Sequence, residues 1–147
     1  MKINIEEIED FGETEITIKC QSISKEILDF INEYKLIDNR LWGILDKQSY
    51  ILNLMDIYYI ETIDNKVFAY TKDKVYEINH KLYALENMLP SKYFFRSSKS
   101  MIINISKIVS IKSLFNGRMQ ASLDNKESVI ISRSNVILFK EMLGVGK

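Results

Sequence analysis

From residue 42 onward, short stretches of this sequence alternate between apolar and polar residues with a period of two. The stretches lie at residues 42–45, 50–53, 57–63, 67–71, 75–78, 101–104, 107–115, 118–123 and 128–132. Such alternation places the apolar side chains on one face of an extended strand. Polar turn sequences separate several of these stretches, and Asn116-Gly117 favours the positive φ angles of a tight hairpin. The pattern predicts a mainly β fold built from antiparallel strands.

Two segments change to a helical period and are expected to cap the strands. In residues 81–89 the leucines and Met88 fall on one helical face, and Pro90 ends the segment. The second short helix is expected in the last apolar segment, residues 134–143. The predicted architecture is therefore antiparallel β-structure with short capping helices.

The first forty residues have a different pattern from the rest of the chain. Residues 2–8 and 14–20 alternate like two short strands, with Gly12 in the turn between them. Residues 24–34 then take a helical period, and Ser24 is suited to be the N-cap. We predict a small strand–strand–helix segment over residues 1–40, followed by a separate domain over residues 41–147.

Length and composition restrict the class of protein. At 147 residues the chain is expected to form one domain, or one domain with a small appendage. No apolar run approaches the about 18 residues that indicate a transmembrane helix, and the acidic N-terminal sequence has no signal-peptide core. The single cysteine, Cys20, cannot form an internal disulfide, which suits a reducing compartment. We therefore expect a cytoplasmic protein.

Charge is distributed unevenly along a chain whose formal net charge is zero. Residues 1–46 contain eleven acidic and five basic residues, whereas residues 91–147 contain three acidic and ten basic residues, a net charge of +7. A basic C-terminal part is suited to a polyanionic partner. Composition alone also allows charges that simply balance within one solvated surface.

Residues suited to catalysis or metal binding are scarce. The one histidine, His80, stands beside a predicted helix start, where a surface or capping role is expected. Cys20 lies in an alternating stretch without a nearby histidine, which favours a small buried hydrophobic residue. The sequence has no Cys/His cluster with metal-ligand spacing and no glycine-rich phosphate loop. We predict no catalysis, no cofactor and no bound metal, although carboxylate pairs assembled only in space stay open.

Basic and polar residues gather instead at the ends of the predicted strands. The three groups are Asn65 and Lys66 at a hairpin tip, Arg96, Ser98 and Lys99 before a strand, and Arg133 and Ser134 between the last strand and the last helix. Loop side chains can reach outward from a rigid scaffold, and lysine and arginine bind phosphates and guanine edges. Spacing alone is equally compatible with solvated loop charges.

Three ordered motifs carry a resemblance to a known family. They lie within the segments YYIETIDNKVFAYT, FFRSSKSMIINISKIVSI and NGRMQASLDNKESVIISRSNV. The first matches a D-I-x-Y-I-E pattern over residues 56–61, the second an F-x-R-x-x-x-S-x-x-x-N pattern over residues 94–104, and the third a late Ser-Arg pair at residues 132–133. In this order and spacing, the region from about residue 41 to residue 147 resembles the LytTR-type DNA-binding domain of bacterial transcription regulators.

The resemblance implies an elongated all-β domain with short helices, whose loops enter successive major grooves of double-stranded DNA. The family's first base-reading position corresponds to Asn65 or Lys66. The second corresponds to Lys99 and the third to Ser134. Many members have histidine or asparagine near the second position and a basic residue at the third. Ser134 cannot make the long cationic contact of the third position, so Arg133 is expected to do more of the base reading here. The target sequence is therefore expected to differ from those of such members.

Each of two further motif residues allows two interpretations. Arg96 either holds a phosphate or braces the loop beside it. Asn104 either contacts a base or satisfies backbone groups at a bend, and the second reading is favoured.

The resemblance also indicates partners for the head. The segment over residues 1–40 is too short for a phosphorylation receiver domain, so the chain resembles the stand-alone LytTR regulators. Some of those occur with a small membrane protein as an apparent partner. We expect a homodimer, or two protomers on repeated half-sites, with the head serving dimerisation or such a partner. The alternative is a non-catalytic protein-interaction module that keeps the fold and titrates a partner regulator.

Overall fold

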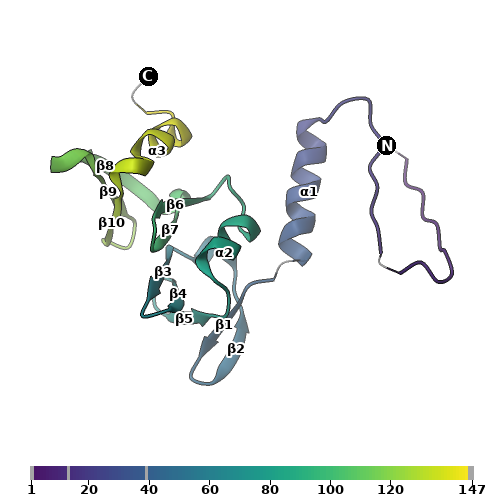
Figure 1. The fold of residues 1–147 in the computed structure, drawn as a ribbon, viewed down its shortest axis with the longest axis horizontal. Coiled ribbons are helices and arrows are strands. Elements are labelled where there is room, and N and C mark those ends of the chain that lie inside the picture. The colour runs from purple at the N-terminus through teal and green to yellow at the C-terminus, as the bar shows by residue number, and fades with distance from the viewer. Residues whose placement is uncertain (1, 13, 39, 146–147) are drawn as a thin grey trace.

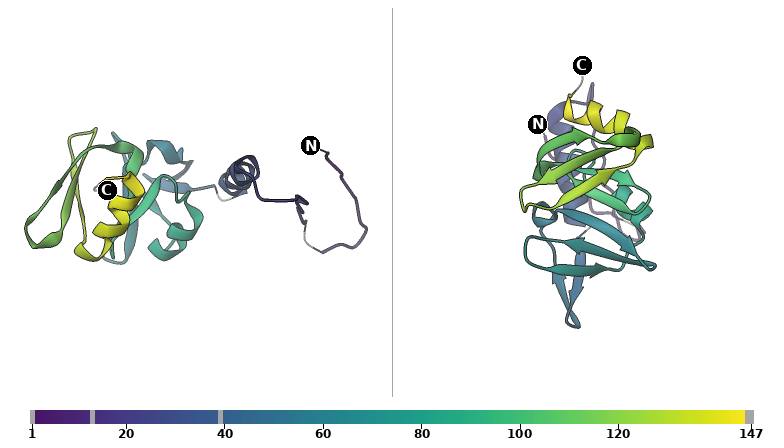
Figure 2. Two further views of the ribbon diagram at one scale, coloured as in Figure 1. Left: turned by 90° about the horizontal axis from the view of Figure 1, so that it is seen from above. Right: turned by 90° about the vertical axis from the view of Figure 1, so that its left-hand side faces the viewer.

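The computed structural model describes residues 2–12, 14–38 and 40–145, and it shows a mainly β fold with two antiparallel sheets (Figure 1). The right panel of Figure 2 shows the smaller sheet above the larger one. Within the described ranges, no helix is both long and apolar enough to cross a membrane. The predicted fold class, antiparallel β-structure with short helices, is confirmed.

The strands are short, as the sequence pattern predicted, and several begin or end a residue or two from the expected positions. They are β1 (Trp42–Leu45), β2 (Gln48–Ile51), β3 (Tyr59–Ile63), β4 (Lys66–Tyr70), β5 (Val75–Ile78), β6 (Phe94–Ser98), β7 (Met101–Asn104), β8 (Ile108–Ser113), β9 (Met119–Leu123) and β10 (Ser128–Ile131). The α-helices are α1 (Lys25–Asp38), α2 (Leu82–Met88) and α3 (Val136–Leu143). The 3-10 turns are η1 (Leu54–Asp56), η2 (Ile105–Lys107), η3 (Phe115–Gly117) and η4 (Arg133–Asn135).

The larger sheet has the strand order β2-β1-β5-β4-β3-β7-β6, and the smaller has the order β10-β9-β8. Tight turns set the register of neighbouring strands. Between β3 and β4, Asp64 and Asn65 have φ angles of 51° and 63°, so that Ile63 pairs directly with Lys66. Aspartate and asparagine tolerate these left-handed conformations, which two-residue hairpin loops require.

Two hydrophobic cores lie on opposite faces of β3 and β7. The first core packs α2, through Leu82 and Leu85, against Ile60 of β3 and Ile102 of β7. The second core packs α3 and the smaller sheet against the other face of β7, where Ile103 is buried. Adjacent residues of a strand point to opposite faces. Strand β7 is therefore buried on both sides, and it fixes the two sheets relative to each other.

A polar cluster also connects the two sheets. The hydroxyl of Tyr58, just before β3, donates a hydrogen bond to Asp124 in the β9–β10 turn. The ammonium of Lys107 lies 4.9 Å from the centre of the Tyr58 ring, a cation–π distance. The hydrogen bond to Asp124, with burial second, raises the pKa of Tyr58 to about 12. The pKa of Tyr58 rises because this hydrogen bond to a carboxylate forms only while the hydroxyl keeps its proton.

The head, residues 1–40, differs in part from the prediction. The helix is confirmed as α1, and the Ile27 amide donates to Ser24 Oγ at 3.3 Å, as expected of an N-cap. In the described residues 2–12 and 14–24, however, the two expected strands do not form. Cys20 is exposed rather than buried. An isolated hairpin is marginal in water, and both cores consist of residues from Leu41 onward.

Candidate nucleic-acid interface

The strand topology places several turns at the same end of the fold. Strands β3 and β7 are antiparallel, with Glu61 opposite Met101. The turn that follows β3 and the turn that precedes β7 therefore lie side by side. A backbone hydrogen bond from the Thr62 amide to the Ser100 carbonyl, 2.8 Å long, joins them. Two of the three predicted site groups, at residues 65–66 and 98–99, are thus neighbours.

The third predicted group is fixed to the same end by the smaller sheet. The Ser132 amide donates to the Ser97 carbonyl at 2.8 Å. This bond ties the end of β10 to β6, and Arg133 and Ser134 follow it directly in η4. The structure therefore brings together segments that are about 70 residues apart in sequence, as the fold must do to build one binding surface.

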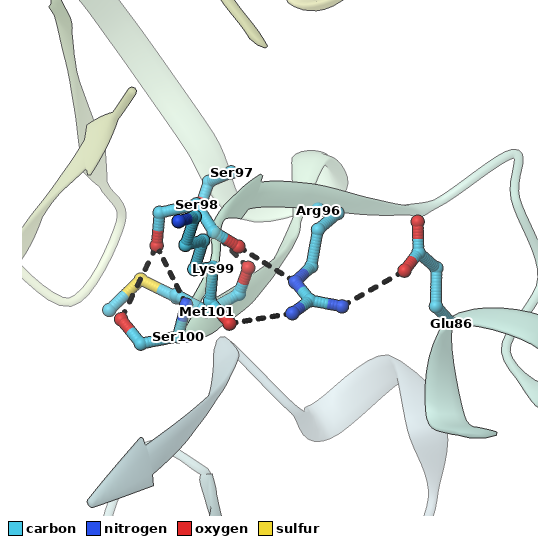
Figure 3. A network of polar contacts seen from close by, with 7 residues as sticks. All are labelled: Glu86, Arg96, Ser97, Ser98, Lys99, Ser100 and Met101. Carbon is cyan, nitrogen blue, oxygen red and sulfur yellow. Dashed lines mark hydrogen bonds and ion pairs between the residues drawn. The ribbon is translucent and has the colours of Figure 1, made fainter. Parts of the chain in front are cut away.

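Arg96 braces the turn between β6 and β7 (Figure 3). Its Nε donates to the Ser98 carbonyl at 2.7 Å, and one terminal nitrogen donates to the Lys99 carbonyl at 2.6 Å. The other terminal nitrogen forms an ion pair with Glu86 of α2 at 2.9 Å. All three guanidinium nitrogens are engaged within the protein, so of its two readings the geometry favours the brace. Because Glu86 is half exposed, the ion pair is the weaker part of this arrangement.

The sequence placed Arg96 and Ser98 before a strand, and the structure corrects this. Both lie inside β6, and only Lys99 and Ser100 form the turn. The alternation was hidden because the strand is irregular between Arg96 and Ser98. The bulge allows the polar Ser97 to be fully buried, with its hydroxyl 3.3 Å from the Met101 carbonyl that accepts its hydrogen bond.

Lys99 is the cation that this turn exposes to solvent. The Ser100 amide donates to Ser98 Oγ at 3.3 Å, and Arg96 holds the Lys99 carbonyl from the other side. The backbone under the lysine is therefore fixed while its side chain is exposed. Such a residue can approach a partner with little further ordering of the main chain.

The other predicted residues are also exposed on ordered turns. Asn65 lies in the two-residue β3–β4 turn, and Lys66 is the first residue of β4. Arg133 and Ser134 lie in η4, and Ser134 Oγ is 3.4 Å from Ser132 Oγ. The structure thus places all seven predicted site residues at one end of the fold, with five of them exposed and Arg96 and Ser98 partly buried.

A fourth turn at this end was not among the predicted site residues. Met119 at the start of β9 pairs with Ile131 at the end of β10, so the β8–β9 turn lies beside η4. This turn carries Phe115 and Arg118, both exposed. The Asn-Gly pair had identified a hairpin tip, but only the sheet pairing shows which end of the fold it occupies.

The end is locally basic. Its four turns and the residues that directly flank them contain Lys66, Lys99, Arg118 and Arg133 as exposed cations, and Asp64 as their one acidic residue. Clusters of one sign of charge attract a polyanion and raise its rate of association. The arrangement is suited to phosphate contacts from several directions at once.

Asn104, by contrast, has a structural role. Its side chain is fully buried, and its Nδ2 donates to the Ile57 carbonyl at 2.8 Å. Its Oδ1 accepts hydrogen bonds from the amide and the hydroxyl of Ser106, at 3.0 and 2.7 Å. The favoured reading, in which Asn104 satisfies backbone groups at a bend, agrees with this geometry.

Comparison with known proteins identifies the family to which this sequence is similar. The sequence profile of the family described as LytTr DNA-binding domain matches residues 47–144. The sensory transduction protein LytT of Enterococcus faecalis is 33% identical over 96 residues, which are 65% of this chain and 40% of that protein. An uncharacterised HTH-type transcriptional regulator of Staphylococcus aureus is 29% identical over 147 residues, 99% of each chain.

A solved structure supports the fold. The LytTr DNA-binding domain of a Bacillus cereus response regulator superposes with a TM-score of 0.68 and 23% sequence identity, covering 72% of this chain and 98% of that one. The Staphylococcus relative carries a helix-turn-helix name. In this chain, five strands, β6 to β10, separate α2 from α3. Helices α2 and α3 therefore do not form a helix-turn-helix, and the name of the Staphylococcus relative does not describe how the surface of this chain is built.

Proposed function

This chain belongs to the LytTR DNA-binding domain family, and from that premise we propose that it is a transcriptional regulator that binds specific sequences in double-stranded DNA. The proposed binding surface is the basic end, defined as the β3–β4, β6–β7 and β8–β9 turns together with η4. The loops of this end would enter successive major grooves on repeated half-sites. A protein with this function acts in the cytoplasm, where bacterial DNA lies.

The convergence of the basic turns is the observation that supports this proposal most strongly. Turns from distant parts of the sequence meet through backbone bonds from Thr62 to Ser100 and from Ser132 to Ser97. A solvated surface of balanced charge would carry acids and bases in similar numbers, whereas these four adjacent turns carry a single acid. Rigid backbone beneath exposed cations is also what readout of base edges requires, because base contacts depend on position.

The residues of the basic end divide into readers and supports. We assign base contacts to Lys99, Arg133 and the Asn65-Lys66 pair, because their side chains are exposed at the tips of fixed turns. Ser134 is suited to positioning contacts with phosphate oxygens. Arg96 is a positioning residue that acts through the Lys99 backbone.

Selection of bound sequences from random duplex DNA tests the proposed function. We expect the full chain to enrich a repeated motif whose two copies are spaced by about one helical turn, 10–10.5 base pairs, or a multiple of it. Recovery of no common motif, with retained binding of a protein partner, would favour the interaction module that titrates another regulator.

Replacing Lys99 by alanine should relax the preference at one base pair of the selected site. A lysine that donates to guanine O6 and N7 contributes about 1–3 kcal/mol of discrimination. The ratio of affinities for the selected and scrambled duplexes should therefore fall by about fivefold to 150-fold. Titration of both duplexes over a salt series measures this ratio. Equal losses on the two duplexes would show that Lys99 contributes charge only.

The head has features of an association element. The described residues 2–12 and 14–24 form neither helix nor strand and expose isoleucines such as Ile3 and Ile5, while α1 exposes Leu28 and Phe30. The left panel of Figure 2 shows the head extending away from the two sheets. Exposed apolar residues in such number indicate an interaction surface. We assign it to a second copy of this chain, because repeated half-sites call for two protomers.

A chain that begins at Arg40 should fold but lose the dimer. Both cores consist of residues from Leu41 onward, so its urea midpoint should match that of the full chain. Sedimentation should give a dimer mass for the full chain and a monomer mass for the shortened one. The double variant Ile3→Ser, Ile5→Ser keeps the full length of the chain and removes only two exposed apolar side chains. It should also dissociate into monomers. An unchanged oligomeric state in both would assign the head to another partner, such as a small membrane protein.

A further inference from the structure

The β8–β9 turn presents an aromatic side chain that the fold does not use. Phe115 is 88% exposed, whereas the other phenylalanines of strands β4 and β6 and of α3 are buried or half-buried. A phenyl ring in water forgoes the stabilisation that burial would give it. An aromatic residue left at the tip of a turn is therefore a candidate contact residue.

The turn that carries Phe115 is well ordered by its own backbone. The Leu114 amide donates to the Arg118 carbonyl at 2.8 Å, closing the loop above the Ser113–Met119 pair. Asn116 and Gly117 have φ angles of 71° and 76°, a conformation that few residues other than asparagine and glycine adopt. The ring is therefore displayed from a fixed backbone position.

The same turn is in contact with η4. A Cβ atom added to Gly117 would lie 3.1 Å from Cδ and 3.2 Å from Cγ of Arg133. The aliphatic part of Arg133 thus lies against the turn at the glycine, where a larger residue would have to push the arginine side chain aside. Phe115 and Arg118 belong to the same turn, on the two sides of Gly117 in the sequence. The turn that carries the exposed ring is therefore in contact with a residue to which we assign base reading.

We propose that residues 115–118 are a further DNA-contacting element, in which Phe115 makes an apolar contact with the base stack and Arg118 binds a backbone phosphate. The proposal rests on the proposed function of the basic end. Apolar side chains contact thymine methyl groups in the major groove or insert between base steps in the minor groove. In either groove the ring adds affinity without adding charge, which distinguishes it from the basic residues around it.

Alanine substitutions of Phe115 and Arg118 distinguish an apolar contact with DNA from an ionic one. Phe115→Ala should lower affinity for the selected duplex by about tenfold to a hundredfold, the effect of losing a buried phenyl ring. It should leave the slope of log affinity against log salt unchanged. Arg118→Ala should make that slope shallower by about one unit, because one phosphate contact is lost. Fluorescence anisotropy of a labelled selected duplex, measured over a salt series, gives both quantities.

Val109→Ala is the matched control, because Val109 is 65% exposed on β8 at the opposite end of the same hairpin. It should bind like the wild type. Wild-type affinity for Phe115→Ala would overturn the proposal while the proposed function stands. Loss of dimer mass in Phe115→Ala without DNA would also overturn it, by assigning the ring to a second protein copy. If the unaltered chain bound no duplex, the proposed function and this contact would both fail.

Discussion

Replacing Arg96 by alanine should lower the affinity for the selected duplex by about tenfold or more, and the affinity for the scrambled duplex by less. The guanidinium holds the carbonyls of Ser98 and Lys99 at 2.7 and 2.6 Å. Without it the β6–β7 turn loses both charge-assisted hydrogen bonds and no longer presents Lys99 in one place. Anisotropy titrations of both duplexes measure the loss, and urea unfolding checks that the domain is still folded.

Two further variants identify the physical cause. Arg96→Lys keeps the charge but replaces the planar guanidinium, which uses two separate nitrogens for these bonds, by a single ammonium that does not reproduce their geometry. It should therefore lose nearly as much affinity as the alanine variant. Glu86→Gln removes only the ion pair with a half-exposed carboxylate and should bind almost like the wild type. Wild-type affinity for Arg96→Lys would instead show that Arg96 acts through its charge on a phosphate.

Replacing Asn104 by alanine should destabilise the domain by about 2–4 kcal/mol. The change leaves the Ile57 carbonyl and both Ser106 donors without their buried partner. It also opens a small cavity beside β7, the strand that both cores share. For a domain of this size the melting temperature should fall by roughly 10–25 °C. Urea unfolding followed by tryptophan fluorescence measures the difference.

Asn125→Ala is a suitable control for this prediction. Asn125 also accepts a hydrogen bond from an amide two residues ahead, that of Glu127 at 3.0 Å, but this bond is exposed to solvent. Its loss should cost less than about 1 kcal/mol, because water replaces the missing partner. Equal losses from the two substitutions would show that the buried network of Asn104 contributes little.

The fold class could be predicted from the sequence because strand alternation and turn chemistry are local properties. The hairpin at residues 64–65 and the Asn116-Gly117 turn followed from residues that tolerate positive φ angles. Strand β6 was missed for a local reason too. Its bulge buries Ser97 and interrupts the alternation, so the segment read as a polar loop.

In the head, the sequence pattern predicted strands that do not form. Residues 2–8 and 14–20 have a strand-like alternation, yet no strand forms in the described residues of this region. Alternation states which face of a strand would be apolar, but a strand also needs a neighbour to satisfy its backbone groups. Only the tertiary structure shows that both sheets are filled by residues from Trp42 onward.

The sequence by itself determined the residue types of the candidate site, because charge and turn propensity depend only on a residue and its neighbours in the sequence. It identified Lys66, Lys99 and Arg133 as basic residues at strand ends. The tertiary structure decided that these ends face the same way, through hydrogen bonds between segments distant in sequence. It also decided that Arg96 supports a turn and that the turn of Phe115 lies against Arg133. Which ends of which strands meet depends on sheet pairing, and pairing is a property of the whole chain.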